Sequence, residues 1–125
     1  MKTLMRSLTA PHVDYGFLYG LVEKSPNFVP SDIDGVIERN GVFLFFEWKN
    51  PLEDMNAGQE KMLISLAKKP DIFVVKIIGD TINGVPTIYE FFILKGEEWV
   101  NKGKSLSEFI DFYLRWIKYA SEKYE

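Results

Sequence analysis

The chain has 125 residues and a formal net charge of −3, and it contains no cysteine and a single histidine. These counts exclude disulfides, cysteine-ligated zinc and a thiol nucleophile. A hydrolytic site would therefore be built from carboxylates, lysine, hydroxyls and an oxygen-liganded cation. The length suits one domain over residues 1–125.

The composition also bears on location and partners. The N-terminal segment lacks the apolar run of a signal peptide, and no stretch approaches the ~20 apolar residues of a membrane span. We therefore expect a cytoplasmic protein without a membrane partner. The negative net charge does not support an isolated nucleic-acid binder, because such proteins are usually basic.

The first half of the chain predicts a helix followed by a hairpin. Val13, Phe17 and Leu21 recur at four-residue spacing, which is typical of a helix, and Ser25-Pro26 is expected to end it. Asn40-Gly41 predicts a two-residue hairpin turn, because both central positions of a type I′ turn need positive φ. The flanking strands are expected over Ile33–Arg39 and Val42–Trp48.

The second half predicts a helix, two strands and a long helix. Asn56 is expected to cap the shorter helix as part of a capping-box-like pair with Gln59, and Pro70 closes it. Strands are predicted over 71–79 and 86–94, with a second Asn-Gly pair between them. Ser105 opens the last helix through an S-x-x-E capping box. The expected apolar stripe of that helix consists of Leu106, Phe109, Ile110, Tyr113, Trp116, Ile117 and Ala120. The order α-β-β-α-β-β-α predicts an α+β or mixed α/β layer.

The hairpin turn decides which residues face each other. With Asn40-Gly41 as the loop, Asp34 faces Glu47, and Asp32 faces Lys49. Because side chains alternate along a strand, these four polar residues share one face. The other face is expected to pack into the core and is apolar or glycine, with Ile33, Gly35, Ile37, Leu44, Phe46 and Trp48.

Two carboxylates placed across a hairpin repel each other, because their Cβ atoms lie ~4.5–5.5 Å apart. A divalent cation between Asp34 and Glu47 would offset that repulsion, and Lys49 could orient an attacking water beside a phosphate. Metal, carboxylates and lysine can hydrolyse a phosphodiester without histidine or cysteine. The alternative is a solvated strand end in which Lys49 makes a surface ion pair with Asp32.

These residues resemble the PD-(D/E)XK nuclease superfamily, in particular the small archaeal Holliday junction resolvases and the virus-type replication-repair nuclease domains. Residues 30–35 resemble the acidic motif, and Phe46-Glu47-Trp48-Lys49 resembles the E-x-K motif. Gly58-Gln59 and the apolar residues behind it resemble the helix that follows, so the resemblance covers roughly the N-terminal two-thirds of the chain. It implies a restriction-endonuclease-like core, with a central mixed sheet and flanking helices.

Carried over by position, the resemblance implies that Asp34, Glu47 and the backbone carbonyl of Trp48 bind Mg²⁺ or Mn²⁺. Lys49 would hold or activate the water, and Gln59 would position the site or contact the nucleic-acid backbone. The remaining candidates are Asp32 as an alternative to Asp34, Glu23 as an acidic ligand from the first helix, and Lys61, Lys68 and Lys69 as phosphate contacts.

The expected function is a metal-dependent endonuclease acting on the phosphodiester bonds of DNA, with branched or junction DNA as a candidate substrate. A homodimer is expected because resolvase-like relatives act as dimers on two-fold junctions. Phe112 and Tyr119 lie off the main stripe of the last helix. They would either form the surface of this homodimer or be buried more deeply in the core. There are two alternatives. One is a catalytically inactive nuclease-fold protein that binds a protein partner in a DNA-processing assembly, and the other is a purely structural α+β domain.

Overall fold

The computed structural model describes residues 14–124. The chain divides into two compact units, residues 1–32 and residues 33–125, which are described separately. Within the described part of the first unit there is one short 3₁₀ helix, η1 (Tyr15–Leu18), whose cap Asp14 accepts a hydrogen bond from the Gly16 N–H at 2.8 Å. None of the helices described in residues 14–124 is long and apolar enough to cross a membrane.

The predicted first helix is wrong over the described residues. Phe17 and Leu21, whose spacing predicted a helix, are 71% and 72% exposed, and the short 3₁₀ helix ends before Leu21. Gly16 and Gly20 lie between the apolar residues, and glycine costs a helix about 1 kcal/mol each relative to alanine. Gly20 adopts a φ of 82°, which a helix does not use. The start of the predicted helix, with Val13, lies outside the described residues.

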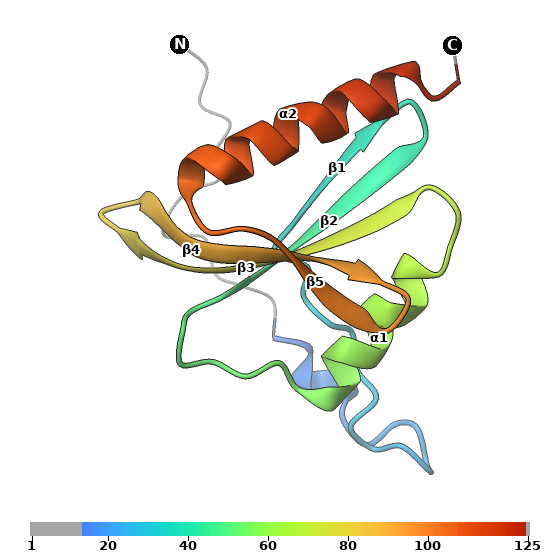
Figure 1. Cartoon of the computed structure of the whole chain (residues 1–125). Helices are drawn as coiled ribbons and strands as arrows, with labels where there is room; N and C mark the ends of the chain where they lie inside the picture. The colour runs from blue at the N-terminus through green and yellow to red at the C-terminus, as the bar shows by residue number, and fades with distance from the viewer. Residues whose placement is uncertain (1–13, 125) are drawn as a thin grey trace, which may run out of the picture. The chain divides into compact units, whose positions relative to one another are not determined.

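Residues 33–124 form an α+β fold with a five-stranded mixed sheet and two α-helices, which confirms the coarse prediction (Figure 1). The strands follow the order β1-β2-β3-β4-β5 across the sheet. Only β2 and β3 are parallel, and the other neighbours are antiparallel. The elements are β1 (Gly35–Arg39), β2 (Val42–Lys49), α1 (Ala57–Ala67), β3 (Ile72–Ile82), β4 (Val85–Lys95), β5 (Glu98–Gly103) and α2 (Leu106–Glu122).

The fifth strand is absent from the predicted order. Strand β5 carries mostly polar residues, and only Trp99 and Val100 are apolar, so it lacks the alternation that marks a strand. The preceding turn contains Gly96 at a φ of 63°. Strand β5 is held in an extended conformation by its antiparallel pairing with β4, in which Leu94 pairs with Trp99, and not by its own sequence.

The hairpin turn and its register are confirmed. Asn40 and Gly41 have φ values of 56° and 83°, as a type I′ turn requires. Arg39 pairs with Val42, and Gly35 pairs with Phe46 at the other end of the ladder. The second Asn-Gly pair makes the corresponding turn between β3 and β4.

The two helices cover opposite faces of the sheet (Figure 1). Helix α2 packs on the face formed by the even-numbered residues of β2, where Leu44 is buried and Phe46 contributes to the core, as predicted for this face. Helix α1 packs through Leu63 on the other face, against Val74 and Leu94. On this face α1 also reaches the end of β2, where Gln59 contacts Glu47, whereas Asp34 and Val36 on the same face of the hairpin are exposed.

The apolar stripe of α2 is confirmed in part. Phe109, Trp116 and Ala120 are buried, and Ser105 accepts a hydrogen bond from the Glu108 N–H at 3.1 Å, as a helix cap does. Leu106 and Ile110, however, are 39% and 49% exposed. Phe112 is partly buried against the core, where its ring lies 5.5 and 5.9 Å from the ring centroids of Phe91 and Phe109.

The C-terminal end of α2 is tied to the start of β3. Lys123 Nζ lies 2.7 Å from Asp71 Oδ1, and the Tyr124 hydroxyl donates a hydrogen bond to Asp71 Oδ2. These contacts lower the pKa of Asp71 and raise the pKa of Lys123. Arg39 Nε also donates a hydrogen bond to Ser121 Oγ at 2.8 Å. The end of α2 therefore contacts both the β1–β2 hairpin and the start of β3.

The bulge between β3 and β4 makes a stability prediction. Gly79 is buried at the register shift, and a Cβ on it would overlap the carbonyl oxygen of Thr87. We expect Gly79→Ala to lower the free energy of unfolding by ~1–3 kcal/mol in urea titration, because the backbone must move. The matched control Gly58→Ala, at an open position of α1, should hold or increase stability. Equal stability of both variants would contradict this packing.

Candidate active site

Glu47 is the feature around which the site is built. It lies on β2, on the face that α1 covers, and it is 4% exposed. Among the described residues it is the one charged side chain that is buried. A buried carboxylate is stable only when it is paired and hydrogen-bonded, so its partners define the site.

Two side chains hold the Glu47 carboxylate. Gln59 Nε2 donates a hydrogen bond to Glu47 Oε1 at 2.6 Å, and Lys49 Nζ lies 3.4 Å from the same oxygen. Asn56 positions Gln59, because its Oδ1 accepts a hydrogen bond from the Gln59 N–H at 2.7 Å. The predicted cap is thus confirmed, but the Gln59 side chain reaches across to the sheet and binds Glu47.

Asp34 lies next to this cluster, as the hairpin register predicts. It directly precedes β1, it is exposed, and its Oδ2 accepts a hydrogen bond from the Trp48 N–H at 2.7 Å. Burial raises the pKa of Glu47, and the negative charge of Asp34 raises it further, whereas Lys49 and Gln59 act in the opposite direction. The negative charge of Asp34 thus acts on Glu47 across the hairpin, in addition to the effect of burial.

The free oxygens of the cluster fit a bound cation and its waters. Both contacts that described residues make with the Glu47 carboxylate use Oε1. Gln59 Oε1 is buried and has no hydrogen-bond partner within residues 14–124, so it would accept from a water held beside Glu47. No group of three acidic or histidine ligands is present in this range, but Mg²⁺ commonly binds one or two carboxylates and keeps several waters.

Lys49 has partners that differ from the expected surface pair with Asp32. Its side chain is only 12% exposed, and besides Glu47 it lies 4.0 Å from Glu53 Oε2. The prediction did not include Glu53, whose other oxygen accepts from the Asn50 N–H at 3.0 Å. In the sequence, the indication of this contact is the spacing of four residues between Lys49 and Glu53, across the turn at Asn50.

Lys76 is a second cation beside the site. It pairs with Glu47 in the register of β2 and β3, and its Nζ lies 4.5 Å from the Trp99 ring centroid and 4.9 Å from that of Phe92. Burial lowers the pKa of Lys76, and the nearby carboxylates of Glu60 and Glu90 partly oppose that effect. Its side chain is therefore held under aromatic rings, in contrast to a mobile surface lysine.

The three lysines predicted to contact phosphate do not enter the cluster in the described structure. Lys61, Lys68 and Lys69 are exposed on or just after α1, and Lys68 Nζ lies 3.9 Å from Glu97 Oε2. Glu23 and Asp32 belong to the first unit and are exposed. Their roles, and that of the Trp48 carbonyl, stay predictions.

Comparison with protein-family models, with curated proteins and with solved structures finds no match to this chain. The chemistry of the site therefore has to be inferred from the contacts of Glu47, Lys49, Gln59 and Asp34 alone.

The raised pKa of Glu47 predicts how stability depends on pH. A carboxyl group whose folded pKa lies above the ordinary value of 4.5 binds more protons in the native state than in the unfolded state. Stability contributed at this position therefore falls as pH rises through 4.5 toward the folded pKa. We expect Glu47→Gln to gain thermal stability relative to the wild type as pH rises from about 4 to about 7 in EDTA.

The matched control is Glu97→Gln, which changes a carboxyl group on the exposed turn between β4 and β5. The difference in Tm between this variant and the wild type should change less across the same range. A pH-independent difference for Glu47→Gln would contradict the burial of a charged group at this position.

Proposed function

We propose that this chain is a metal-dependent nuclease that hydrolyses phosphodiester bonds of DNA, on a restriction-endonuclease-like core of the PD-(D/E)XK type. The observation that carries the proposal is the buried Glu47 carboxylate, which Lys49 and Gln59 hold beside Asp34. A purely structural position would favour an apolar residue here, because burying an ion pair costs more than burying a hydrophobic side chain of similar size.

Each residue has a distinct task in this proposal. Asp34 and Glu47 would hold the Mg²⁺ or Mn²⁺ ion with the Trp48 carbonyl, and the ion would act as a Lewis acid and lower the pKa of a bound water. Lys49 is oriented by Glu47 and Glu53, so its ammonium group can position the attacking water and offset charge on the phosphate. Gln59 keeps the Glu47 carboxylate in place and presents a free acceptor oxygen.

The topology supports the same proposal. The glutamate and lysine lie at the end of β2, and α1 connects this strand to its parallel neighbour β3. The acidic residue comes from the start of the strand that forms the hairpin with β2. The full proposal includes one domain over residues 1–125, a homodimer, a cytoplasmic location and branched or junction DNA as the substrate.

A second candidate is a catalytically inactive binding or accessory protein that keeps this fold in a DNA-processing assembly. One observation favours it: the side chains of Glu47 and Lys49 are only 5% and 12% exposed. A pair so thoroughly covered could act as a specific buried contact between α1 and the sheet without admitting substrate.

Cleavage assays test the catalytic proposal. With Mg²⁺ or Mn²⁺, we expect the wild type to cleave at least one substrate from a panel of junction, flap, nicked, linear and single-stranded DNA. Lys49→Ala and Glu47→Gln should reduce the rate by ~100-fold or more, because they remove groups that act on the water and the cation. Lys118→Ala, an exposed change on α2, is the matched control and should retain the wild-type rate. Circular dichroism would verify folding, and cleavage by both site variants at the wild-type rate would overturn the mechanism.

Thermal shift measurements separate the two candidates. A cation that binds only the folded state stabilises it by about 2.7 kcal/mol at a concentration ~100 times its Kd. We expect Mn²⁺ to raise the Tm of the wild type and of Glu97→Gln, but not that of Glu47→Gln. A wild type that shows neither a shift nor cleavage would favour the inactive binding protein.

A further inference from the structure

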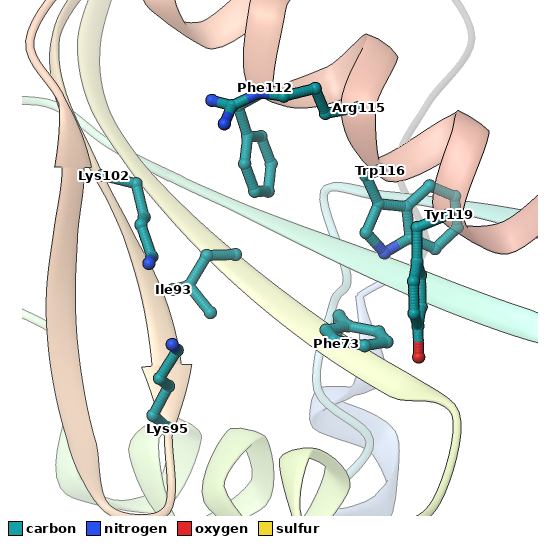
Figure 2. A pocket seen from close by; sticks show the side chains of 8 residues that line it. All are labelled: Phe73, Ile93, Lys95, Lys102, Phe112, Arg115, Trp116 and Tyr119. Carbon is teal, nitrogen blue, oxygen red and sulfur yellow. The ribbon is translucent and has the colours of Figure 1, made fainter.

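A pocket of about 400 Å³ lies between α2 and the sheet, on the face opposite to Glu47 (Figure 2). Its residues come from β3, β4, β5 and α2, all within residues 33–125. None of them takes part in the candidate active site. The volume falls in the range of pockets that bind small molecules and cofactors.

Three cations from three different elements line this pocket. Lys95 ends β4, Lys102 belongs to β5, and Arg115 projects from α2. The positive charge of Lys95 lowers the pKa of Lys102, and Arg115 contributes to the same effect, so the three charges lie close enough to repel. The salt bridges formed among residues 14–124 include Arg115 with Asp111, at 3.2 Å on the exposed side, but neither lysine. A chain of net charge −3 thus places three cations at one pocket, and the two lysines form no salt bridge within residues 14–124.

The walls of the pocket are aromatic. Phe73 lies edge-on to Trp116 and to Tyr119, with ring centroids 6.3 and 5.7 Å apart, and Phe112 lines the side next to Arg115. Flat rings around an open space suit a planar ligand that stacks or packs edge-on. A simple anion such as phosphate would leave most of this apolar surface unused.

Trp116 supplies an independent indication of a ligand. The residue is 6% exposed, and its indole Nε1 is buried without a hydrogen-bond partner in the described part of the chain. Figure 2 shows this nitrogen on the side of the ring that faces Phe73 and the pocket. A buried N–H normally has an acceptor, so an acceptor atom within the pocket would satisfy it.

We propose that this pocket binds a nucleotide, with the phosphate at Lys95, Lys102 and Arg115 and the base between the aromatic walls, where a ring acceptor meets Trp116 Nε1. Phosphate gives charge for the cations, and a base gives both a flat face and hydrogen-bond acceptors. The nucleotide is either free in solution or the phosphorylated end of a single strand. The site is separate from Glu47, so it does not depend on the nuclease proposal.

Isothermal titration calorimetry of the full chain in EDTA tests this site. The probes are adenosine monophosphate, adenosine, inorganic phosphate and a short single strand with a 5′-phosphate. We expect saturable binding of the monophosphate at least about tenfold tighter than that of adenosine or phosphate. Tighter binding of the strand than of the monophosphate would identify a strand end as the ligand, and equal or weaker binding would identify the free nucleotide.

Variants locate the binding. The double variant Lys102→Gln and Arg115→Gln should weaken binding of the monophosphate about tenfold or more, whereas Lys118→Gln on the same helix should not. Trp116→Phe keeps an aromatic ring but removes the N–H, so it should weaken binding of the monophosphate and leave binding of phosphate unchanged. Glu47→Gln should bind as the wild type does even if the nuclease proposal fails. No saturable binding of any nucleotide, or equal affinity in the double variant and the wild type, would overturn the proposal.

Discussion

The parallel pairing of β2 with β3 is the constraint on which the rest of the structure depends. Parallel neighbours cannot be joined by a tight turn, so the chain must cross over one face of the sheet. Helix α1 makes that crossover, and its first turn places Gln59 over Glu47. The other face stays open for α2, which covers the larger apolar cluster. One pairing therefore produces both the enclosed carboxylate and the aromatic pocket on the opposite face.

The groups around the enclosed carboxylate have opposing effects on its ionisation. Burial and Asp34 both oppose ionisation of Glu47, and Lys49 and Gln59 favour it. Such opposing contributions are typical of groups that bind or transfer charge, although structural ion pairs show them as well. On the far face the imbalance has the opposite sign, since Lys95 and Lys102 repel each other. The ligands that we propose for the two faces accordingly differ in charge, a cation at one and an anion at the other.

Features that depend on a few neighbouring residues could be predicted from the sequence. Asn40-Gly41 determined the turn, and the turn determined that Asp34 lies opposite Glu47, because the register of a two-residue hairpin is set by its loop. Asn56 and Ser105 cap their helices as their local patterns indicate.

Features that depend on distant contacts could not be predicted in this way. Gln59 of α1 contacts Glu47 and helps to bury it, and no local pattern near Glu47 indicates this burial. Strand β5 is ordered by β4 in spite of its polar sequence, and Phe112 is partly buried because it packs against Phe91. The spacing of Phe17 and Leu21 resembled a helix, yet the intervening glycines favour turns.

The anchor at the end of α2 bears on how the protein is made. Tyr124 binds Asp71 across 53 positions of sequence, and Ser121 binds Arg39 across 82. Contacts of such long range form late, because a large loop must close before they contribute any stability. On the ribosome, the hairpin and the β2–α1–β3 crossover can emerge and pair while these C-terminal partners are still in the exit tunnel. The corner of the sheet is then secured only after residues 121–124 have left the exit tunnel.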